Sequence, residues 1–199
     1  GMTELVNQMA RLTNKTVVVQ DKNMRITYSS EQPRFARHWD SLESFMTNPN
    51  NLPAEIQDRE RVSEIDNPVM MQSLHIEHLA RLVCPIITKD RGRGYLSVIG
   101  YEDDLDEVDS MVTEHGAAAC ALEMAKAKAI SETEKRLRGK FLDRLLIGDV
   151  DLEEAIRQGE RLNHDMTRMH IAIILAWRGD KTPSIRRLET TINSYVART

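Results

Sequence analysis

The chain has 199 residues, 41% of them hydrophobic and 29% charged, and its net charge of −4 implies no overall attraction to nucleic acid. Its length allows one or two domains. Cys84 and Cys120 lie far apart without a CxxC spacing, which argues against a disulfide framework or a zinc site and is typical of a reducing cytoplasm. No apolar run is long enough to span a membrane, so we expect a cytoplasmic protein without membrane attachment.

The first part of the sequence predicts a helix, a hairpin and a second helix. Apolar side chains recur at helical spacing over residues 2–13. Two β-branched runs, TVVVQ at 16–20 and RITYS at 25–29, flank a short polar turn and predict a hairpin. A helix rich in aromatic residues should end before Pro49. The charged stretch 55–64 is either helical or exposed.

A second pair of strands is expected at 79–87 and 95–101, around the glycine-containing turn KDRGRG. Gly92 and Gly94 suit a hairpin turn better than a phosphate cradle, because no Lys-Ser pair follows and the turn leads into a strand. The acidic stretch 102–109 complements the positive end of the helix that follows. A divalent-metal site is the alternative, although the spacing does not match an EF-hand loop.

Residues 104–147 contain no proline and predict one long helix. We expect its first half to close the domain upstream and its second half to connect that domain to the C-terminal part of the chain. Basic residues in this helix alternate with acidic ones, which favours a solvated surface over contacts with nucleic acid or interchain ion pairs. Its alanines favour a homodimer contact. The apolar stripe of the first half comprises Leu105, Val108, Val112, His115, Ala119 and Leu122.

Beyond residue 149 the pattern changes to helix, strand and helix. Asp151 is expected to cap a helix whose inward residues are Leu152, Ala155, Ile156, Gly159 and Leu162. Residues 168–178 read as a strand whose apolar run 171–175 suits burial on both faces. Thr182 and Pro183 mark the start of another helix. One strand with its helices cannot bury such a run. We therefore expect this region to be part of a larger α/β domain or to pair between chains.

The stretch ETEKRLRGKFLDRLLIGDVDLEEAIRQGERLNHDM, which follows the α+β part and precedes RMHIAIILAW, resembles the connecting region of bacterial PucR/CdaR-type transcription regulators. The family's phenylalanine, paired leucines and glycine match Phe141, Leu145, Leu146 and Gly148. Its leucine-glycine-x-aspartate turn matches Leu162, Asn163 and Asp165. Asn163 replaces the glycine, and asparagine tolerates the left-handed conformation of a helix cap. The sensor half matches the family only in architecture.

The resemblance implies the fold class and the domains. We expect an α+β protein in which a GAF/PAS-like antiparallel sheet with helices is followed by a long connecting helix and a truncated, GGDEF-like α/β segment. The corresponding ranges are 2–125 for the sensor domain, 126–148 for the connecting helix and 149–199 for the partial α/β segment. The family's helix-turn-helix is absent, so DNA binding is expected only through a domain that this chain lacks.

Catalytic patterns are missing from the sequence. Its metal-like cluster is His75, Glu77, His78 and Cys84, in which His75 and His78 would share a helical face, but neither HExxH nor CxxC spacing occurs. GGDEF, GxSxG, P-loop and dinucleotide signatures are also missing. We therefore expect that the chain is not an enzyme and that it binds no metal and no cofactor. A metal-dependent enzyme remains a third interpretation, which requires a metal on the two histidines.

A ligand pocket, if there is one, is expected under the segment between the two hairpins. An anionic group of the ligand would meet Arg37 or Arg81. Alternatively, the aromatic and methionine side chains of this segment simply fill the core. The expected lining residues are Phe35, Trp39, Met70, Met71 and His75.

The functional hypothesis combines these expectations. The chain would be the sensor and homodimerisation region of a transcription regulator, in which an unknown small metabolite changes the arrangement of the long helix. Such a relay requires a ligand that binds two helix arrangements with different affinity. The alternative is a structural dimerisation module that binds no ligand.

Overall fold

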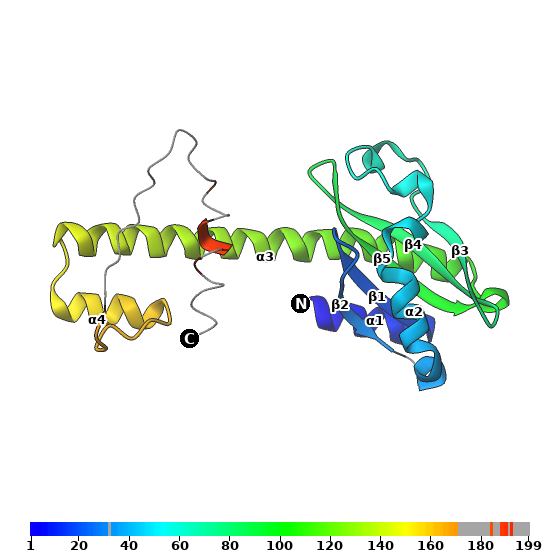
Figure 1. The fold of residues 1–199 in the computed structure, drawn as a ribbon, viewed down its shortest axis with the longest axis horizontal. Coiled ribbons are helices and arrows are strands. Elements are labelled where there is room, and N and C mark those ends of the chain that lie inside the picture. Colours follow the sequence, from blue (N-terminus) through cyan, green and yellow to red (C-terminus); the bar gives the residue numbers. More distant parts are fainter. Residues whose placement is uncertain (32, 171–183, 185–187, 191, 193–199) are drawn as a thin grey trace. The chain divides into compact units, whose positions relative to one another are not determined.

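The structure, a computed structural model, describes residues 1–31, 33–170, 184, 188–190 and 192. The chain forms two compact units, Gly1–Leu137 and Arg138–Thr199, and each is described by itself. The first unit contains a five-stranded sheet with helices (Figure 1). The expected α+β class, an antiparallel sheet with helices and a long helix after it, is confirmed.

The sheet has the strand order β2-β1-β5-β4-β3, with every neighbouring pair antiparallel. Both expected hairpins are present, β1 with β2 and β4 with β5. β3 was not predicted, because its sequence MMQSLHI lacks the β-branched runs of the other strands. The bounds are Thr16–Asp21 for β1, Ile26–Ser30 for β2, Met70–Ile76 for β3, Leu79–Thr88 for β4 and Arg91–Tyr101 for β5.

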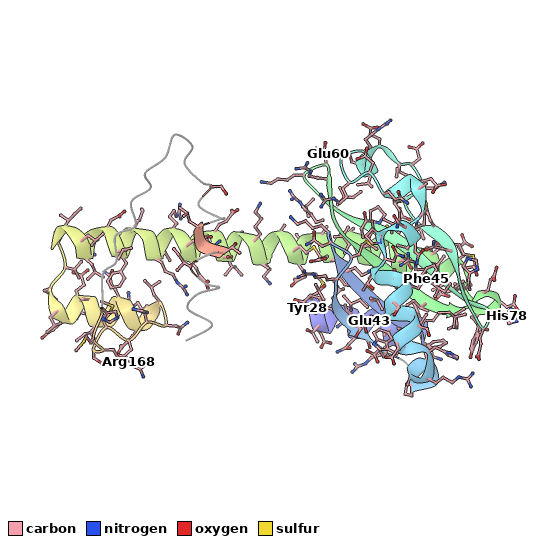
Figure 2. All side chains as sticks on the ribbon, viewed as in Figure 1. Tyr28, Glu43, Phe45, Glu60, His78 and Arg168 are labelled. Atoms are coloured by element: carbon pink, nitrogen blue, oxygen red, sulfur yellow. The ribbon has the colours of Figure 1, made fainter. Side chains whose placement is uncertain are left out.

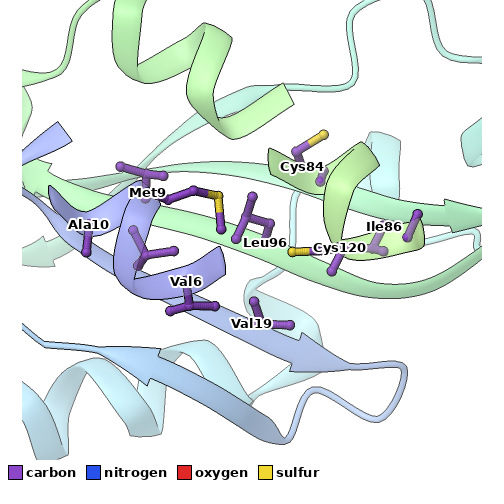
Figure 3. Close-up of a cluster of buried hydrophobic side chains, with 12 residues drawn as sticks. Val6, Met9, Ala10, Val19, Cys84, Ile86, Leu96 and Cys120 are labelled. Carbon is purple, nitrogen blue, oxygen red and sulfur yellow. The ribbon is translucent and has the colours of Figure 1, made fainter. Parts of the chain in front are cut away.

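Two helices, α1 (Met2–Thr13) and α3 (Glu107–Ile147), pack on one face of the sheet. Figure 3 shows side chains from α1, α3 and the strands meeting in this layer of the core. Burial raises the pKa of both the Cys84 and the Cys120 thiol to about 12. The cysteines therefore act as small apolar core residues, as their spacing indicated.

The face of α3 that contacts the sheet differs from the predicted stripe. Val108, His115 and Leu122 are exposed, so their predicted inward orientation was wrong. Small side chains let the helix lie close to the strands, whereas the larger apolar ones project away from them. The buried residues of α3 at this contact are Asp109, Thr113, Gly116, Ala117, Cys120 and Ala121.

The opposite face of the sheet is covered by α2 (Trp39–Thr47) and by the segment that follows it. The short 3₁₀ helix Pro33–His38 leads into α2, which ends before Pro49 as expected. The charged stretch 55–64 forms turns and short 3₁₀ helices, with Ile56 and Val62 buried beneath it. Two apolar clusters lie on this face, one around Phe35 and Leu42 and the other around Ile56, Val83 and Tyr95.

The β4–β5 turn is shorter than the sequence suggested. Lys89 and Asp90 form it, both with positive φ, as a tight hairpin turn requires. Gly92 and Gly94 lie within β5 instead of the turn. A Cβ atom on Gly94 would lie 2.1 Å from the carbonyl oxygen of Gln20. Gly94 therefore serves the close approach of β5 to β1.

A buried ion pair joins the end of α1 to the start of α3. Lys15 Nζ lies 2.8 Å from Asp109 Oδ2, and the side chains are only 10% and 2% exposed. Asp109 also accepts a hydrogen bond from the Asp106 backbone N–H, while Asp106 accepts one from the Asp109 N–H. This reciprocal arrangement is a capping box, here built from two aspartates. The acidic stretch thus starts the helix, as predicted.

The second unit begins within α3, whose last residues are followed by Gly148, with φ +80°, and by α4 (Leu152–Arg161). Asp151 caps α4 as predicted, accepting a hydrogen bond from the Glu154 N–H at 2.7 Å. Arg144 donates two hydrogen bonds to the Glu154 carboxylate, at 2.9 and 3.3 Å. Asn163 has φ 56°, the left-handed conformation that asparagine was expected to tolerate at this position.

Several expectations for the second unit fall on residues that the structure does not describe. The expected strand run 171–175 lies outside the described residues. So do the expected start of the last helix at Thr182 and most of the residues predicted to form it. Leu152 was expected inward but is 74% exposed, so this prediction was wrong. Ala155 and Gly159 of the same helix are buried as expected.

Among the described residues, no helix has the length and apolar character needed to cross a membrane.

Asp109→Asn should destabilise the chain. The substitution leaves the Lys15 ammonium buried without a counter-charge, which typically costs about 3 kcal/mol. The free energy of unfolding in urea, followed by circular dichroism, measures the loss. Glu123→Gln is the matched control, because its two ion pairs are 3.9 Å long and at the surface, so the change should be within about 0.5 kcal/mol. Equal losses in both variants would contradict the assigned role of Asp109.

Candidate functional site

Four polar side chains run diagonally across the α2 face of the sheet, one from each of four neighbouring strands. We call Gln20, Ser97, Arg81 and Gln72 the polar diagonal. Ser97 pairs with Val18 of β1 and with Val83 of β4. Gln20 lies two residues after Val18 and Arg81 two residues before Val83, so both are diagonal neighbours of Ser97, on opposite sides. Gln72 of β3 pairs directly with Arg81. Gln20, Ser97 and Arg81 have no exposed surface. The diagonal lies between the two apolar clusters of this face.

The two glutamines tie the diagonal to the backbone around the end of α2. Gln20 Nε2 donates to the Met24 carbonyl at 2.8 Å and to the Met46 carbonyl at 2.9 Å. Gln72 Nε2 donates to the Asn51 carbonyl at 2.6 Å. The segment from Phe45 to Asn51 therefore covers the diagonal.

Arg81 is a cation in the core. Its Nε donates to Gln72 Oε1 at 2.8 Å, and its Nη2 is 3.4 Å from the Asn51 carbonyl. Its Cζ lies 5.9 Å from the centre of the Phe45 ring, and Figure 2 shows Phe45 on α2. Within the part of the chain that the structure describes, no carboxylate forms an ion pair with Arg81. Burial lowers the pKa of Arg81 from its ordinary value of 12.5 to about 10.

Three polar atoms of the diagonal are buried without a hydrogen-bond partner: Gln20 Oε1, Ser97 Oγ and Arg81 Nη1. An unsatisfied buried polar atom costs free energy, so proteins usually pair such atoms with protein, water or a ligand. The three offer different chemistry, namely an acceptor, a hydroxyl and a charged donor. A bound molecule would need an acceptor for Arg81 and a donor for Gln20 to satisfy these atoms.

Two hollows lie on either side of the covering segment. One, of about 510 Å³, is lined by Met24, Asn50, Leu52 and Tyr95 together with Lys22, Asn23, Pro49, Gln57 and Arg59. The other, of about 570 Å³, is open and lies between α2 and β3, where Phe45, Leu74 and His75 line it with Asp40, Ser41, Ser44 and Ile76. Neither hollow is lined by a residue of the polar diagonal, so both lie outside it.

The structure separates the residues that the sequence suggested for a ligand pocket. Arg81 belongs to the polar diagonal, and His75 lines the open hollow beside α2. Phe35 is 1% exposed and packs in the core, with its ring 5.6 Å from that of Tyr101. Trp39 is partly buried against the same cluster. Met71 is 52% exposed on β3.

The remaining candidate, Arg37, lies on the surface near the β3–β4 turn. Its Nη2 is 2.8 Å from Glu77 Oε2, and His38 Nε2 is 3.0 Å from the same oxygen. His75, Glu77 and His78 all have positive φ in this irregular turn, where Figure 2 labels His78. The predicted helical face shared by His75 and His78 was wrong, because a β-hairpin replaces the helix. No cluster of three metal-ligating side chains occurs among the described residues.

Sequence reasoning missed Gln20, Ser97 and Gln72. The available signal was a polar residue at a strand position whose neighbours on the same face are apolar. Gln20 follows three valines, and Ser97 interrupts the apolar run from Tyr95 to Ile99. Periodicity alone does not distinguish such a residue from one at the end of a strand, so the site appeared only once the register was known.

A further hollow of about 400 Å³ lies within the second unit. Its lining includes Phe141, Leu145, Leu162 and Asn163 together with His164 and His170. The segment after His170 lies outside the described residues.

No protein family model and no curated protein matches the sequence significantly. Solved structures similar to the chain include Myxococcus xanthus MglB, at 14% identity and a TM-score of 0.45, covering 63% of this chain and 95% of MglB. The cofactor binding GAF domain of the nutrient sensor CodY from Clostridium difficile has 14% identity and a TM-score of 0.39, with 61% and 83% covered.

Another similar structure is the inducer binding domain of the PobR transcription factor from Acinetobacter, in complex with 3-hydroxybenzoic acid. It has 10% identity and a TM-score of 0.38, and the match covers 60% of this chain and 94% of that domain. At these identities and TM-scores the likeness concerns the coarse fold, and no function is carried over from it.

Arg81→Met should leave the free energy of unfolding unchanged or raise it. Because the pKa of Arg81 is lower in the folded than in the unfolded chain, the buried charge reduces stability at every pH below about 10. A methionine of similar length removes this cost and keeps the apolar stem. Unfolding in urea at neutral pH measures the change. Arg91→Met, at an exposed arginine paired with Glu60, is the control. A loss above about 2 kcal/mol in Arg81→Met alone would show that the guanidinium is structural.

Proposed function

We propose that this chain is the ligand-sensing and dimerisation region of a transcription regulator resembling the PucR family. Binding of a small metabolite on the α2 face of the sheet is relayed through α3 to a DNA-binding domain outside this chain. One observation carries the proposal: three residues at successive diagonal positions of the sheet each hold a buried polar atom without a hydrogen-bond partner. A core built only for stability gains nothing from such atoms, whereas a binding site uses them.

The relay rests on the connection between the sheet and α3. β5 carries Ser97 of the polar diagonal, and only a short 3₁₀ helix separates its end from the start of α3. The Lys15–Asp109 ion pair and the capping box fix this start. A ligand that shifts β5 would therefore act directly on the first turn of α3. The shift requires that the ligand bind the two arrangements with different affinity.

Dimerisation is supported by the outer face of α3. Val108, Met111, His115, Ala118 and Leu122 follow alternating steps of three and four residues, the spacing of a coiled-coil seam. Val108 is 59%, Met111 53% and Leu122 71% exposed in the single chain. Beyond this stripe, all residues from 125 to 137 are exposed. A helix without tertiary contacts is only marginally stable in water, so a second copy of α3 is the partner we propose.

The role we propose is binding, without catalysis or a cofactor, and in the cytoplasm. The competing function is a structural dimerisation module that binds no ligand. It is favoured by Phe35 and its neighbours, which fill the core beneath α2. Both functions predict a dimer. They differ because only the sensor function predicts that a small molecule stabilises the folded chain.

Leu122→Lys should weaken self-association. A lysine at this last and most exposed apolar position of the stripe places two charges in an apolar interface, and we expect the dissociation constant to rise about 100-fold or more. Sedimentation velocity over a range of concentrations measures it. Glu55→Lys, which makes the same kind of charge change at an exposed position outside α3, should associate like the unsubstituted chain. A chain that sediments as a monomer at all concentrations would refute dimerisation through α3.

A metabolite screen distinguishes sensing from a structural role. With the whole chain and a panel of purines, sugar acids and small organic acids, the sensor function predicts that at least one compound raises the melting temperature. The rise should grow with compound concentration, because a ligand that binds only the folded state stabilises it by mass action. A panel without any such compound would favour the structural module.

A further inference from the structure

The polar diagonal identifies a class of ligand, and this inference rests on the sensing function proposed above. We propose that the ligand is a small organic acid with a hydroxyl or amino group close to its carboxylate. The carboxylate would bind Arg81 and Ser97, and the hydroxyl or amino group would donate a hydrogen bond to Gln20.

The buried charge of Arg81 calls for an anion. Its guanidinium is completely buried, and the partners given by the structure are the neutral Gln72 side chain and the Asn51 carbonyl. A buried water could complete its hydrogen bonds but would leave the charge uncompensated. An anion does both. A carboxylate is the anion that best matches the planar guanidinium, and one cation balances one carboxylate.

The neighbours of Arg81 define the rest of the ligand. Ser97 lies on the adjacent strand, diagonal to Arg81, and its hydroxyl can donate to a carboxylate oxygen. Gln20 lies diagonal to Ser97 on the other side, with its Nε2 bonded to two backbone carbonyls and its Oε1 unpaired. Because Oε1 can only accept, the ligand needs an N–H or O–H donor on that side.

Access requires the segment over the diagonal to open, because Gln20, Ser97 and Arg81 have no exposed surface. The Asn51 carbonyl lies 3.4 Å from Arg81 Nη2, a long contact that a carboxylate oxygen would replace with a stronger one. The Phe45 ring lies beside the guanidinium, and hydrogen bonds from Gln20 to Met46 and from Gln72 to Asn51 hold the segment over the diagonal, so entry of the ligand has to open them. Apolar side chains surround the diagonal, which favours an acid with a small apolar body.

The test uses the whole chain and defined probes. Lactate, 2-hydroxyisovalerate, valine and 3-hydroxybutyrate are each compared with the corresponding primary amide by thermal shift and titration calorimetry. We expect at least one acid to bind and its amide to bind about 10- to 100-fold more weakly, the change typical for loss of a hydrogen bond to a charged group. Arg81→Met should weaken binding of the acid to the same extent, and Ser97→Ala about 5-fold. Arg91→Met should bind like the unsubstituted chain.

The possible results separate the ligand class from the sensing function. Equal binding of an acid and its amide, or unchanged binding to Arg81→Met, would overturn the assignment to the polar diagonal. So would a panel in which no acid binds. A purine or sugar that stabilises both the chain and Arg81→Met equally would leave the sensing function intact and refute this site. If neither the acids nor the wider metabolite panel bind, both proposals fail. Because Arg81→Met should fold at least as stably as the parent, loss of binding is not explained by unfolding.

Discussion

The pairing of β5 with β1 on one side and with β4 on the other is the constraint on which the first unit depends. It places Ser97 between Gln20 and Arg81, although these residues are far apart in the sequence. It also permits only glycine at position 94, where the β1 backbone comes closest. The same strand leads directly into α3. A single strand thus organises the core, the candidate site and the helix that we propose as the relay.

The local elements were predictable from the sequence, because local chemistry determines them. The first hairpin follows from β-branched runs and a polar turn, and α3 from a long stretch without proline. Asp151 was recognisable as a cap from its residue type and position. None of these features requires knowledge of the tertiary fold. The anion contact predicted for Arg81 stays a prediction, since the structure shows only that this cation lies buried within an apolar strand.

Features that depend on contacts between distant residues were not predictable. The orientation of α3 was misjudged because large apolar residues usually face a core, whereas here small ones do and the large ones remain exposed. β3 was missed because its stability comes from pairing with β4 rather than from its own sequence. The polar diagonal likewise exists only in the register of four strands, so Gln20, Ser97 and Gln72 could not have been grouped with Arg81 in advance.

The separation of β1 from β5 along the chain also affects how the protein is made. The β1–β2 hairpin leaves the ribosome long before residues 91–101, which form β5. Until then, the edge of β1 that pairs with β5 has no hydrogen-bond partner, and its run of three valines is not covered by the completed core. Long-range pairing of this kind forms slowly, because a large loop must close first. During translation α1 can cover only one side of this nascent hairpin. Until β5 is made, the edge of β1 that will pair with it is therefore a site that a chaperone could protect.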